Sequence, residues 1–180
     1  MHFKRKGSGN TAQTVKLALA AAGERGIRNI VVASSSGRTA LLFANDIGIA
    51  VVCVANAYGY PDSGKGGLDK ATRDRLKQES IEVLATTHVL SGVERGISSE
   101  CGGMYPAEIM SNTLRMLGQG VKVCVEVSIM ALDAGLVPFG EKIVAVGGSG
   151  KGADAAVVIT PAHARKVFDT RIHEIICKPL

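Results

Sequence analysis

Apolar stretches of strand length alternate with stretches of helical character along most of the chain. Residues 29–34 and 49–54 are rich in valine and isoleucine without polar alternation, as in strands buried on both faces of a parallel sheet, and 82–85 is a shorter third strand. This alternation predicts an α/β fold with helices on both faces of the sheet and ligands at the carboxyl ends of the strands. Further strands are expected at 142–146, 155–159 and 171–177. Helices are expected at 11–22, from Gly37 to near Gly48, and at 70–79, 106–117 and 121–136.

The segment 121–136 has two possible interpretations, because valines at alternate positions in its first half are typical of a strand. Its length and the stop at Gly135 favour a buried helix, since a strand of that length is unusual. Glu126 stands in this segment among apolar residues. A carboxylate in such a setting needs a partner, and both a buried structural ion pair and an acid in a functional site meet that description.

A hydroxyl-rich glycine turn follows the strand 29–34 and precedes the helix that is expected to begin after Gly37. Glycine allows a sharp turn, the first N–H groups of a helix lack partners, and the helix dipole adds positive charge, so an anion such as phosphate fits there. The same residues also fit an ordinary turn with Ser36 as the N-cap. The candidate phosphate-binding residues are Ser34, Ser35, Ser36, Gly37, Arg38 and Thr39.

A second glycine-rich loop covers residues 147–154. Its glycines match a dinucleotide fingerprint in spacing, but a strand follows instead of a helix, and Gly152 follows Lys151 where a Walker loop needs serine or threonine. Backbone N–H groups beside a lysine favour an anion-binding nest, and a mobile hairpin connection is the alternative. The candidate residues are Gly147, Gly148, Ser149, Gly150, Lys151 and Gly152.

Two further candidates lie in the segment 86–96, which follows the strand 82–85. His88 is interpreted as a general base, as a hydrogen-bonding partner of a ligand, or as a structural histidine that caps the strand. Arg95 is a second anion ligand or one half of a solvated pair with Glu94. His88 and Glu126 are therefore the candidate catalytic residues, and no spacing of ligand residues indicates a metal site.

Composition narrows the class of protein. A chain of 180 residues, 46% of them hydrophobic, is expected to form one domain over 1–180. The sequence has no apolar run long enough for a membrane span and no apolar core of a signal sequence. Its four cysteines are widely spaced, which fits a reducing compartment, so a cytoplasmic protein is expected. The net charge of +5 favours anionic ligands, but dispersed basic residues and the absence of tryptophan argue against nucleic acid. The loop 58–67 is long enough for a lid.

Four longer motifs carry a resemblance. Together with the two glycine loops, they resemble the C-terminal domain of pyruvate kinase, and more narrowly a mainly prokaryotic family of stand-alone pyruvate kinase C-terminal-like proteins. The motifs are TTHVLSGVER at 86–95, GGMYPAE at 102–108, TLRMLGQGVKV at 113–123 and ALDAGL at 131–136.

This resemblance implies a three-layer α/β/α sandwich around a mixed five-stranded sheet whose last strand is antiparallel. It implies that the serine-glycine turn holds a phosphate group, that the late glycine loop folds over the same ligand, and that the ligand is flavin mononucleotide (FMN). The pair Ala153-Asp154 departs from the kinase loop, which tends to have Thr-Asn. Kinase activity is not implied, because the catalytic barrel alone needs more residues than this chain has.

Three functions agree with these expectations. The first is binding or carriage of a phosphorylated small molecule, which needs both loops and no catalytic group. The second is a flavin-dependent oxidoreductase with a substrate cavity over the ring. The third is a regulatory subunit that reports the state of its ligand to a partner or to its own homo-oligomer.

Overall fold

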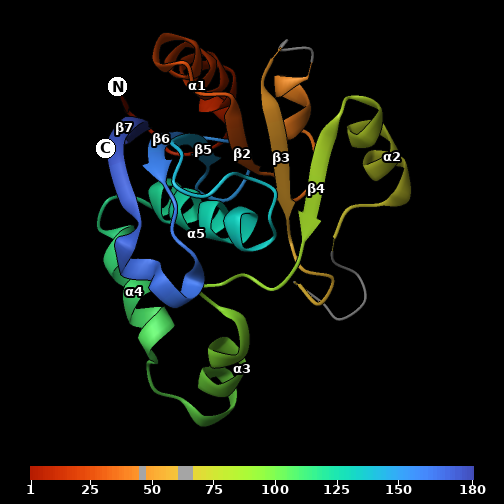
Figure 1. The fold of residues 1–180 in the computed structure, drawn as a ribbon. Helices are drawn as coiled ribbons and strands as arrows, with labels where there is room; N and C mark the ends of the chain where they lie inside the picture. Colours follow the sequence, from red (N-terminus) through yellow and green to blue (C-terminus); the bar gives the residue numbers. More distant parts are fainter. Residues whose placement is uncertain (45–47, 61–66) are drawn as a thin grey trace.

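The computed structural model describes residues 1–44, 48–60 and 67–180. A twisted sheet with the strand order β1-β7-β6-β5-β2-β3-β4 forms the centre of the molecule (Figure 1). The strands are β1 (His2–Phe3), β2 (Asn29–Ala33), β3 (Ala50–Ala55), β4 (Ile81–Ala85), β5 (Ile143–Gly147), β6 (Ala155–Thr160) and β7 (Arg171–Pro179). The α-helices are α1 (Thr11–Arg25), α2 (Lys70–Gln78), α3 (Gly92–Cys101), α4 (Pro106–Arg115) and α5 (Gln119–Asp133), and the 3-10 helices are η1 (Ser8–Asn10), η2 (Ala40–Phe43) and η3 (Ala164–Asp169).

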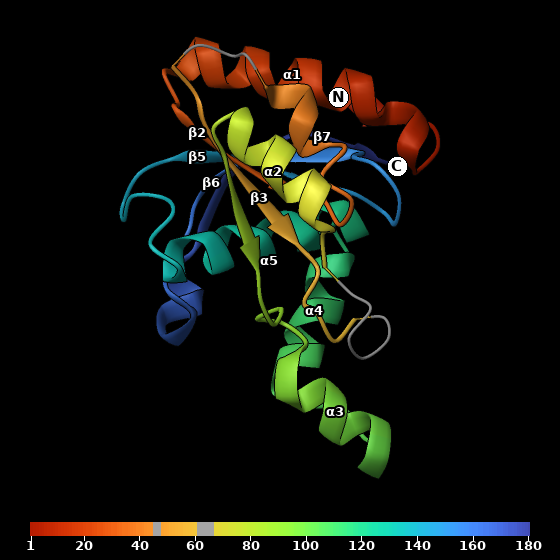
Figure 2. The same ribbon diagram turned by 90° about the vertical axis from the view of Figure 1, so that its right-hand side faces the viewer.

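Helices cover both faces of the sheet, so the predicted three-layer sandwich is confirmed. Figure 2 shows α1 and α2 on one face and α5 on the other. Successive residues of β2 divide between the two cores: Ile30 and Val32 pack in the cluster that includes α1 and α2, and Val31 packs in the cluster that includes α5. Because side chains alternate across a strand, an unbroken apolar run is the pattern that a sheet covered on both faces requires.

The sheet is mixed, as expected, but two details of the expectation are wrong. The described residues form seven strands, whereas the resemblance implied five and the apolar segments predicted six; the strand that the segments did not predict is the short β1, which pairs in parallel with β7 at the edge. The antiparallel strand is β6 and not the last strand, since β6 is antiparallel to both β5 and β7. Residues 148–154 are too few for a crossover, so β5 and β6 form a hairpin, and β7 then returns in the direction of β5.

The ambiguous segment 121–136 is helical, as its length predicted. Twelve of the fifteen residues of α5 are buried, which explains why its apolar residues show no simple helical stripe. One side of α5 packs on β5, β6 and β2, and α4 packs on another. A helix enclosed in this way can carry valine at nearly every position, so periodicity alone does not separate it from a strand.

Two helical expectations differ from the structure. The helix expected from Gly37 to near Gly48 is only a short 3-10 helix over Ala40–Phe43, and Ala44 already has extended dihedral angles (φ −61°, ψ 149°); residues 45–47 lie outside the described residues. Asparagine, aspartate and glycine are frequent in the sequence just after this point, and they are poor helix formers. Conversely, α3 was not predicted, because two glycines and two serines in ten residues hide its helical pattern.

Asp69 caps α2 and gives a pH-dependent contribution to stability. Its carboxylate accepts hydrogen bonds from the Thr72 N–H (2.8 Å) and hydroxyl (2.8 Å), and these bonds lower its pKa. Because the pKa of Asp69 is lower in the folded state than in the unfolded chain, its ionised form stabilises the fold. This stabilisation is fully present at a pH above the unfolded-state pKa of about 4, and it is lost as the pH falls through the folded-state pKa.

We therefore expect the Asp69→Asn variant, which keeps a capping side chain but cannot titrate, to lose less stability than the wild type between about pH 5 and pH 2.5. Urea unfolding at the two pH values measures this difference. Equal pH dependence in the two proteins would contradict it.

Candidate functional site

The carboxyl ends of four neighbouring strands lie in one row. Ala33 of β2 is opposite Val54 of β3, which is opposite Leu84 of β4, and Val32 of β2 is opposite Val146 of β5. All four strands are parallel, so the loops that follow β5, β2, β3 and β4 all leave the same edge of the sheet. This edge is where ligands bind in open α/β sheets.

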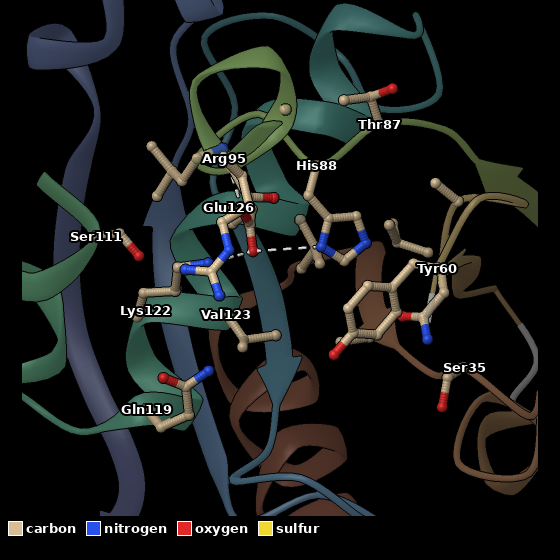
Figure 3. Close-up of a pocket in the computed structure, with 18 of the residues that line it drawn as sticks. Ser35, Tyr60, Thr87, His88, Arg95, Ser111, Gln119, Lys122, Val123 and Glu126 are labelled. Carbon is tan, nitrogen blue, oxygen red and sulfur yellow. Dashed lines mark hydrogen bonds and ion pairs between the residues drawn. The ribbon is translucent and has the colours of Figure 1, made fainter. Parts of the chain in front are cut away.

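A cleft of about 880 Å³ lies over this row of strand ends, within the size range of small-molecule sites. Its lining includes the ends of β2 and β3, the start of α5, the loop after β4 and residues of α3 and α4. Figure 3 shows side chains from these elements directed into the same space. Both predicted loops, together with His88, Arg95 and Glu126, contribute to the lining.

The serine turn reaches the cleft through its first two residues, Ser34 and Ser35. The Ser34 hydroxyl accepts a hydrogen bond from the Thr39 N–H (3.2 Å), and the Ser34 carbonyl accepts one from the Gly37 N–H (3.3 Å), so the turn is held by its own polar groups. Gly37 has φ +71°, and a Cβ there would lie 2.6 Å from Thr72 Cγ2. Glycine is therefore required for both conformation and space.

The rest of the turn lies outside the cleft lining. Arg38 donates from Nε to the Ser36 hydroxyl (3.2 Å). The N-cap of η2 is Thr39 and not Ser36, and no side chain caps this 3-10 helix. Because η2 has only four residues, the turn is not followed by an α-helix with a macrodipole, so this part of the predicted phosphate seat is wrong. The residues of the turn that do not line the cleft are Ser36, Gly37, Arg38 and Thr39.

Cys53 of β3 contacts the start of the serine turn through its side chain. Its thiol is buried and donates a weak hydrogen bond to the Ser34 carbonyl (Sγ to O, 3.6 Å). Burial raises the pKa of Cys53 to about 12, although the nearby charge of Arg73 lowers it. The thiol therefore stays protonated and acts as a structural donor, because a nucleophilic cysteine needs a lowered pKa.

The late glycine loop is the connection of the β5–β6 hairpin, and it places Gly148, Gly150 and Gly152 in the cleft lining. An added Cβ on Gly148 would collide with the Gly152 carbonyl, so the two arms of the loop approach too closely for a side chain. Gly150 (φ +114°) and Gly152 (φ +69°) have conformations that other residues rarely adopt. The glycines thus expose backbone to the cleft, as an anion-binding loop requires.

The other predicted residues of this loop do not line the cleft. Gly147 ends β5 and packs against the start of α5, where the Gly120 carbonyl leaves no room for a Cβ. Ser149 donates its hydroxyl to buried Asp154 (3.3 Å), whose other oxygen accepts the Gly7 N–H (2.8 Å). Lys151 also lies outside the lining.

The ion pair of Lys122 and Glu126 is buried at the side of the cleft. Lys122 Nζ lies 2.6 Å from Glu126 Oε2, and the other carboxylate oxygen accepts the Leu90 N–H at 3.1 Å. His88 Nδ1 lies 3.6 Å from Glu126 Oε2 (Figure 3). Glu126 is 1% exposed, so it is held as a structural pair, and its place in the cleft wall also joins it to the candidate site.

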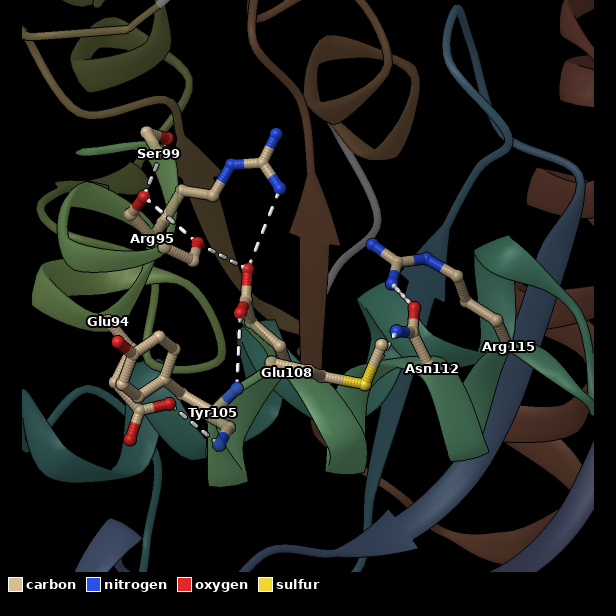
Figure 4. Close-up of polar contacts among 10 residues, drawn as sticks. Glu94, Arg95, Ser99, Tyr105, Glu108, Asn112 and Arg115 are labelled. Carbon is tan, nitrogen blue, oxygen red and sulfur yellow. Dashed lines mark hydrogen bonds and ion pairs between the residues drawn. The ribbon is translucent and has the colours of Figure 1, made fainter. Parts of the chain in front are cut away.

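Helix α3 projects from the body, and α4, which packs on α5, joins it to the rest of the molecule (Figure 2). One interpretation expected Arg95 of α3 to pair with Glu94, and this pair does not form. Instead, Arg95 Nη1 lies 3.7 Å from Glu108 Oε1, and Glu94 accepts the Ala107 N–H at 2.7 Å (Figure 4). The Arg95 side chain is 72% exposed, so this pair is weak and its guanidinium is accessible. Arg115 also belongs to the cleft lining.

Sequence reasoning missed Lys122 as a site residue. The signal was present, because Lys122 and Glu126 have the spacing that places two side chains on the same side of a helix. The proposed lid at 58–67 falls partly on residues 61–66, which lie outside the described residues, whereas Tyr60 lines the cleft. Within the described ranges, no group of three His, Cys, Asp or Glu residues has the geometry of a metal site, and no helix could cross a membrane.

Comparison with known proteins identifies the fold family. The family model of the pyruvate kinase alpha/beta domain matches residues 12–159. Two solved pyruvate kinase structures from Cryptosporidium parvum, one in complex with ADP, are similar at 14% identity, with TM-scores of 0.41 and 0.43. They cover 80% and 86% of this chain but only 21% and 24% of their own, so the chain spans less than a quarter of those kinases. The chain belongs to the pyruvate kinase alpha/beta domain family.

Proposed function

We propose that the cleft binds a phosphorylated small molecule, with its phosphate between the serine turn and the late glycine loop. The observation that carries this proposal is the meeting of the two loops at adjacent strand ends: β2 leads into Ser34 and Ser35, and its neighbour β5 leads into Gly148. In the described part of the chain, the Ser35 N–H donates no hydrogen bond. A free N–H group, a hydroxyl and an exposed glycine backbone form a suitable environment for phosphate oxygens.

Charge in the cleft supports an anionic ligand. The lining contains the cations of Arg95, Arg115 and Lys122 and the carboxylates of Glu108 and Glu126. Lys122 is neutralised by Glu126, and Arg95 is only loosely paired, so positive charge remains in reach of a ligand. Arg115 donates to Asn112 (Figure 4) and to Gln119 but has no carboxylate partner among the described residues. Guanidinium groups bind phosphate well because of their planar donors.

FMN is the specific ligand that we propose. The cleft is large enough for a ligand that is longer than a simple phosphate, and it is lined by both polar and apolar groups. The buried His88 Nε2 has no hydrogen-bond partner, which indicates a polar group still to be bound there. These residues fit a flavin nucleotide, and a bound flavin would supply redox chemistry.

The first test is FMN titration of two serine variants one position apart. Ser35 lines the cleft and Ser36 does not, so Ser35→Asp places a negative charge at the phosphate and Ser36→Asp does not. We expect Ser35→Asp to weaken FMN binding by about tenfold or more, and Ser36→Asp to change it by less than about threefold, because the effect of a charge falls with distance and screening. Isothermal calorimetry or flavin fluorescence measures both affinities.

Riboflavin is the matched control ligand, because it has the ring and the polyol of FMN but no phosphate. The proposal requires riboflavin to bind the wild type more weakly than FMN and to respond less to Ser35→Asp. Equal affinities for the two flavins would contradict a phosphate seat. No thermal shift with either flavin would contradict FMN as the ligand.

A further inference from the structure

A line of three polar side chains, Lys122, Glu126 and His88, ends in a ring nitrogen without a partner. Lys122 Nζ bonds to Glu126 Oε2 (2.6 Å), and His88 Nδ1 lies 3.6 Å from that same oxygen. The second ring nitrogen, His88 Nε2, is inaccessible to solvent and has no hydrogen-bond partner in the described part of the protein. Buried polar atoms are almost always satisfied, so an unsatisfied one on a cleft wall needs an explanation.

Glu126 Oε2 lies 3.6 Å from His88 Nδ1, which is longer than a hydrogen bond but close enough for the charge of the carboxylate to bias the tautomer of the imidazole. A neutral imidazole carries one N–H, and a carboxylate beside Nδ1 favours the proton on that nitrogen. Nε2 then has a free lone pair and can only accept a hydrogen bond. Glu126 is fixed by Lys122 and by the Leu90 N–H, so its position and that of His88 are coupled.

We propose that His88 Nε2 accepts a hydrogen bond from an N–H or O–H group in the part of the ligand beyond the phosphate, and that Glu126 is the positioning residue that presents His88 in this tautomer. This inference rests on the proposed binding of a phosphorylated ligand in the same cleft. It adds a specificity rule: a ligand without a donor at that place loses the bond that His88 offers, whatever its phosphate does.

The positions of the strands fix how far from the phosphate this recognition takes place. Ser35 follows β2 and His88 follows β4, with β3 between them. Two strand spacings separate these loops by about 10 Å at the sheet edge. This separation places His88 opposite a polyol chain or a ring, and not opposite the phosphate itself.

Tyr60 stands beside the route to Nε2. Figure 3 shows its ring next to the imidazole, and its side chain is largely exposed. A ligand donor reaches Nε2 when the Tyr60 side chain turns away. Exposed aromatic side chains change rotamer readily, so this movement does not require a change in the fold.

The test compares two amide variants of His88 with two probes. Asparagine places its amide near the position of Nδ1 and lacks an atom at Nε2, whereas glutamine reaches the position of Nε2 with an oxygen that can accept. We expect His88→Asn to weaken FMN binding by about three- to tenfold and His88→Gln to recover part of this loss, in line with one hydrogen bond. Binding of inorganic phosphate should not change in either variant.

A second measurement needs no ligand, and its deciding result comes from the wild-type protein. Nitrogen-15 NMR of the wild-type protein should show His88 with Nδ1 protonated and Nε2 unprotonated in its neutral form. In Glu126→Gln this preference should weaken, although the substitution keeps the shape of the side chain. The opposite tautomer in the wild type would overturn the proposal, even if both His88 variants bind FMN poorly.

The two probes separate this inference from the proposed function. If phosphate and FMN bind the wild type and both His88 variants equally, the role of His88 is overturned and phosphate binding stands. If FMN and phosphate both fail to bind the wild type, the proposed function is overturned and this inference with it. Loss of phosphate binding in the His88 variants would also overturn the inference, because it would place His88 at the phosphate.

Discussion

Glu126→Leu is expected to lower the free energy of unfolding by about 3–5 kcal/mol, because it leaves the Lys122 ammonium buried without a counter-charge. The side chains of Glu126 and Lys122 are 2% and 6% exposed, and their 2.6 Å contact is the shortest ionic contact that either makes among the described residues. The Leu90 N–H would also lose its acceptor. Chemical unfolding at neutral pH measures the loss.

The control for this prediction is an ion pair with the same spacing in solvent. Lys70 and Asp74 are also four residues apart and 2.6 Å from each other, but their side chains are 89% and 55% exposed. Asp74→Leu should therefore change stability far less than Glu126→Leu. The double variant Lys122→Met/Glu126→Leu should recover most of the loss, since it removes both buried charges. If the losses of stability in Lys122→Met and in Glu126→Leu simply add up in the double variant, the interpretation is contradicted.

Gly37→Ala is expected to cost about 2–4 kcal/mol in the free energy of unfolding, from backbone strain and from overpacking. The residue has φ +71°, which an alanine adopts at a cost, and its Cβ would lie 2.6 Å from Thr72 Cγ2. The serine turn would have to move relative to α2. We therefore expect FMN affinity to fall along with stability, measured on protein that is still folded at the temperature of the titration.

A second substitution separates the two causes. Thr72→Ser removes Cγ2 and keeps the hydroxyl that donates to Asp69, so Gly37→Ala/Thr72→Ser should recover the overpacking part and retain the strain. Gly23→Ala is the matched control, because Gly23 lies in α1 and no atom is near the position of an added Cβ. This substitution should slightly raise the free energy of unfolding, since alanine favours the helix more than glycine does. No recovery in the double variant would show that the clash with Thr72 does not matter.

The sequence predicts the central architecture well because burial on both faces leaves a direct pattern. The runs at 29–34 and 49–54 became β2 and β3 with the expected direction, and 121–136 became α5. Asp69 stands directly before the helix expected at 70–79, and in the structure its carboxylate accepts the Thr72 N–H as an N-cap. These features depend on local rules that each segment satisfies alone.

The features that sequence analysis missed depend on tertiary structure. The strand β1 is formed only through pairing with β7, which is about 175 residues away. The direction of β6 follows from a hairpin connection and not from its own residues. The short length of η2 was also not visible in the sequence. The turn keeps its glycine and hydroxyl groups, but no α-helix follows it, so a helix dipole does not contribute to the predicted phosphate site.

His88 shows the same limit within the candidate site. Its place after a strand was visible in the sequence, but the partner that orients it lies 38 residues later on another element. The sequence alone therefore does not separate a structural histidine from a ligand-binding one. In the structure, one ring nitrogen of His88 lies 3.6 Å from a carboxylate, and the other has no hydrogen-bond partner among the described residues.

The anchoring of the late glycine loop couples the cleft to a segment that never touches it. Asp154 accepts the Gly7 N–H, and the Thr11 hydroxyl accepts the Ala153 N–H, so residues 7–11 hold the outer side of the loop while Gly148 and Gly152 face the cleft. By thermodynamic reciprocity, whatever free energy a ligand gains by ordering this loop is returned as added stability of the segment 7–11. If the cleft binds the proposed ligand, substitutions in that segment are therefore expected to change the affinity without altering a single contact to the ligand.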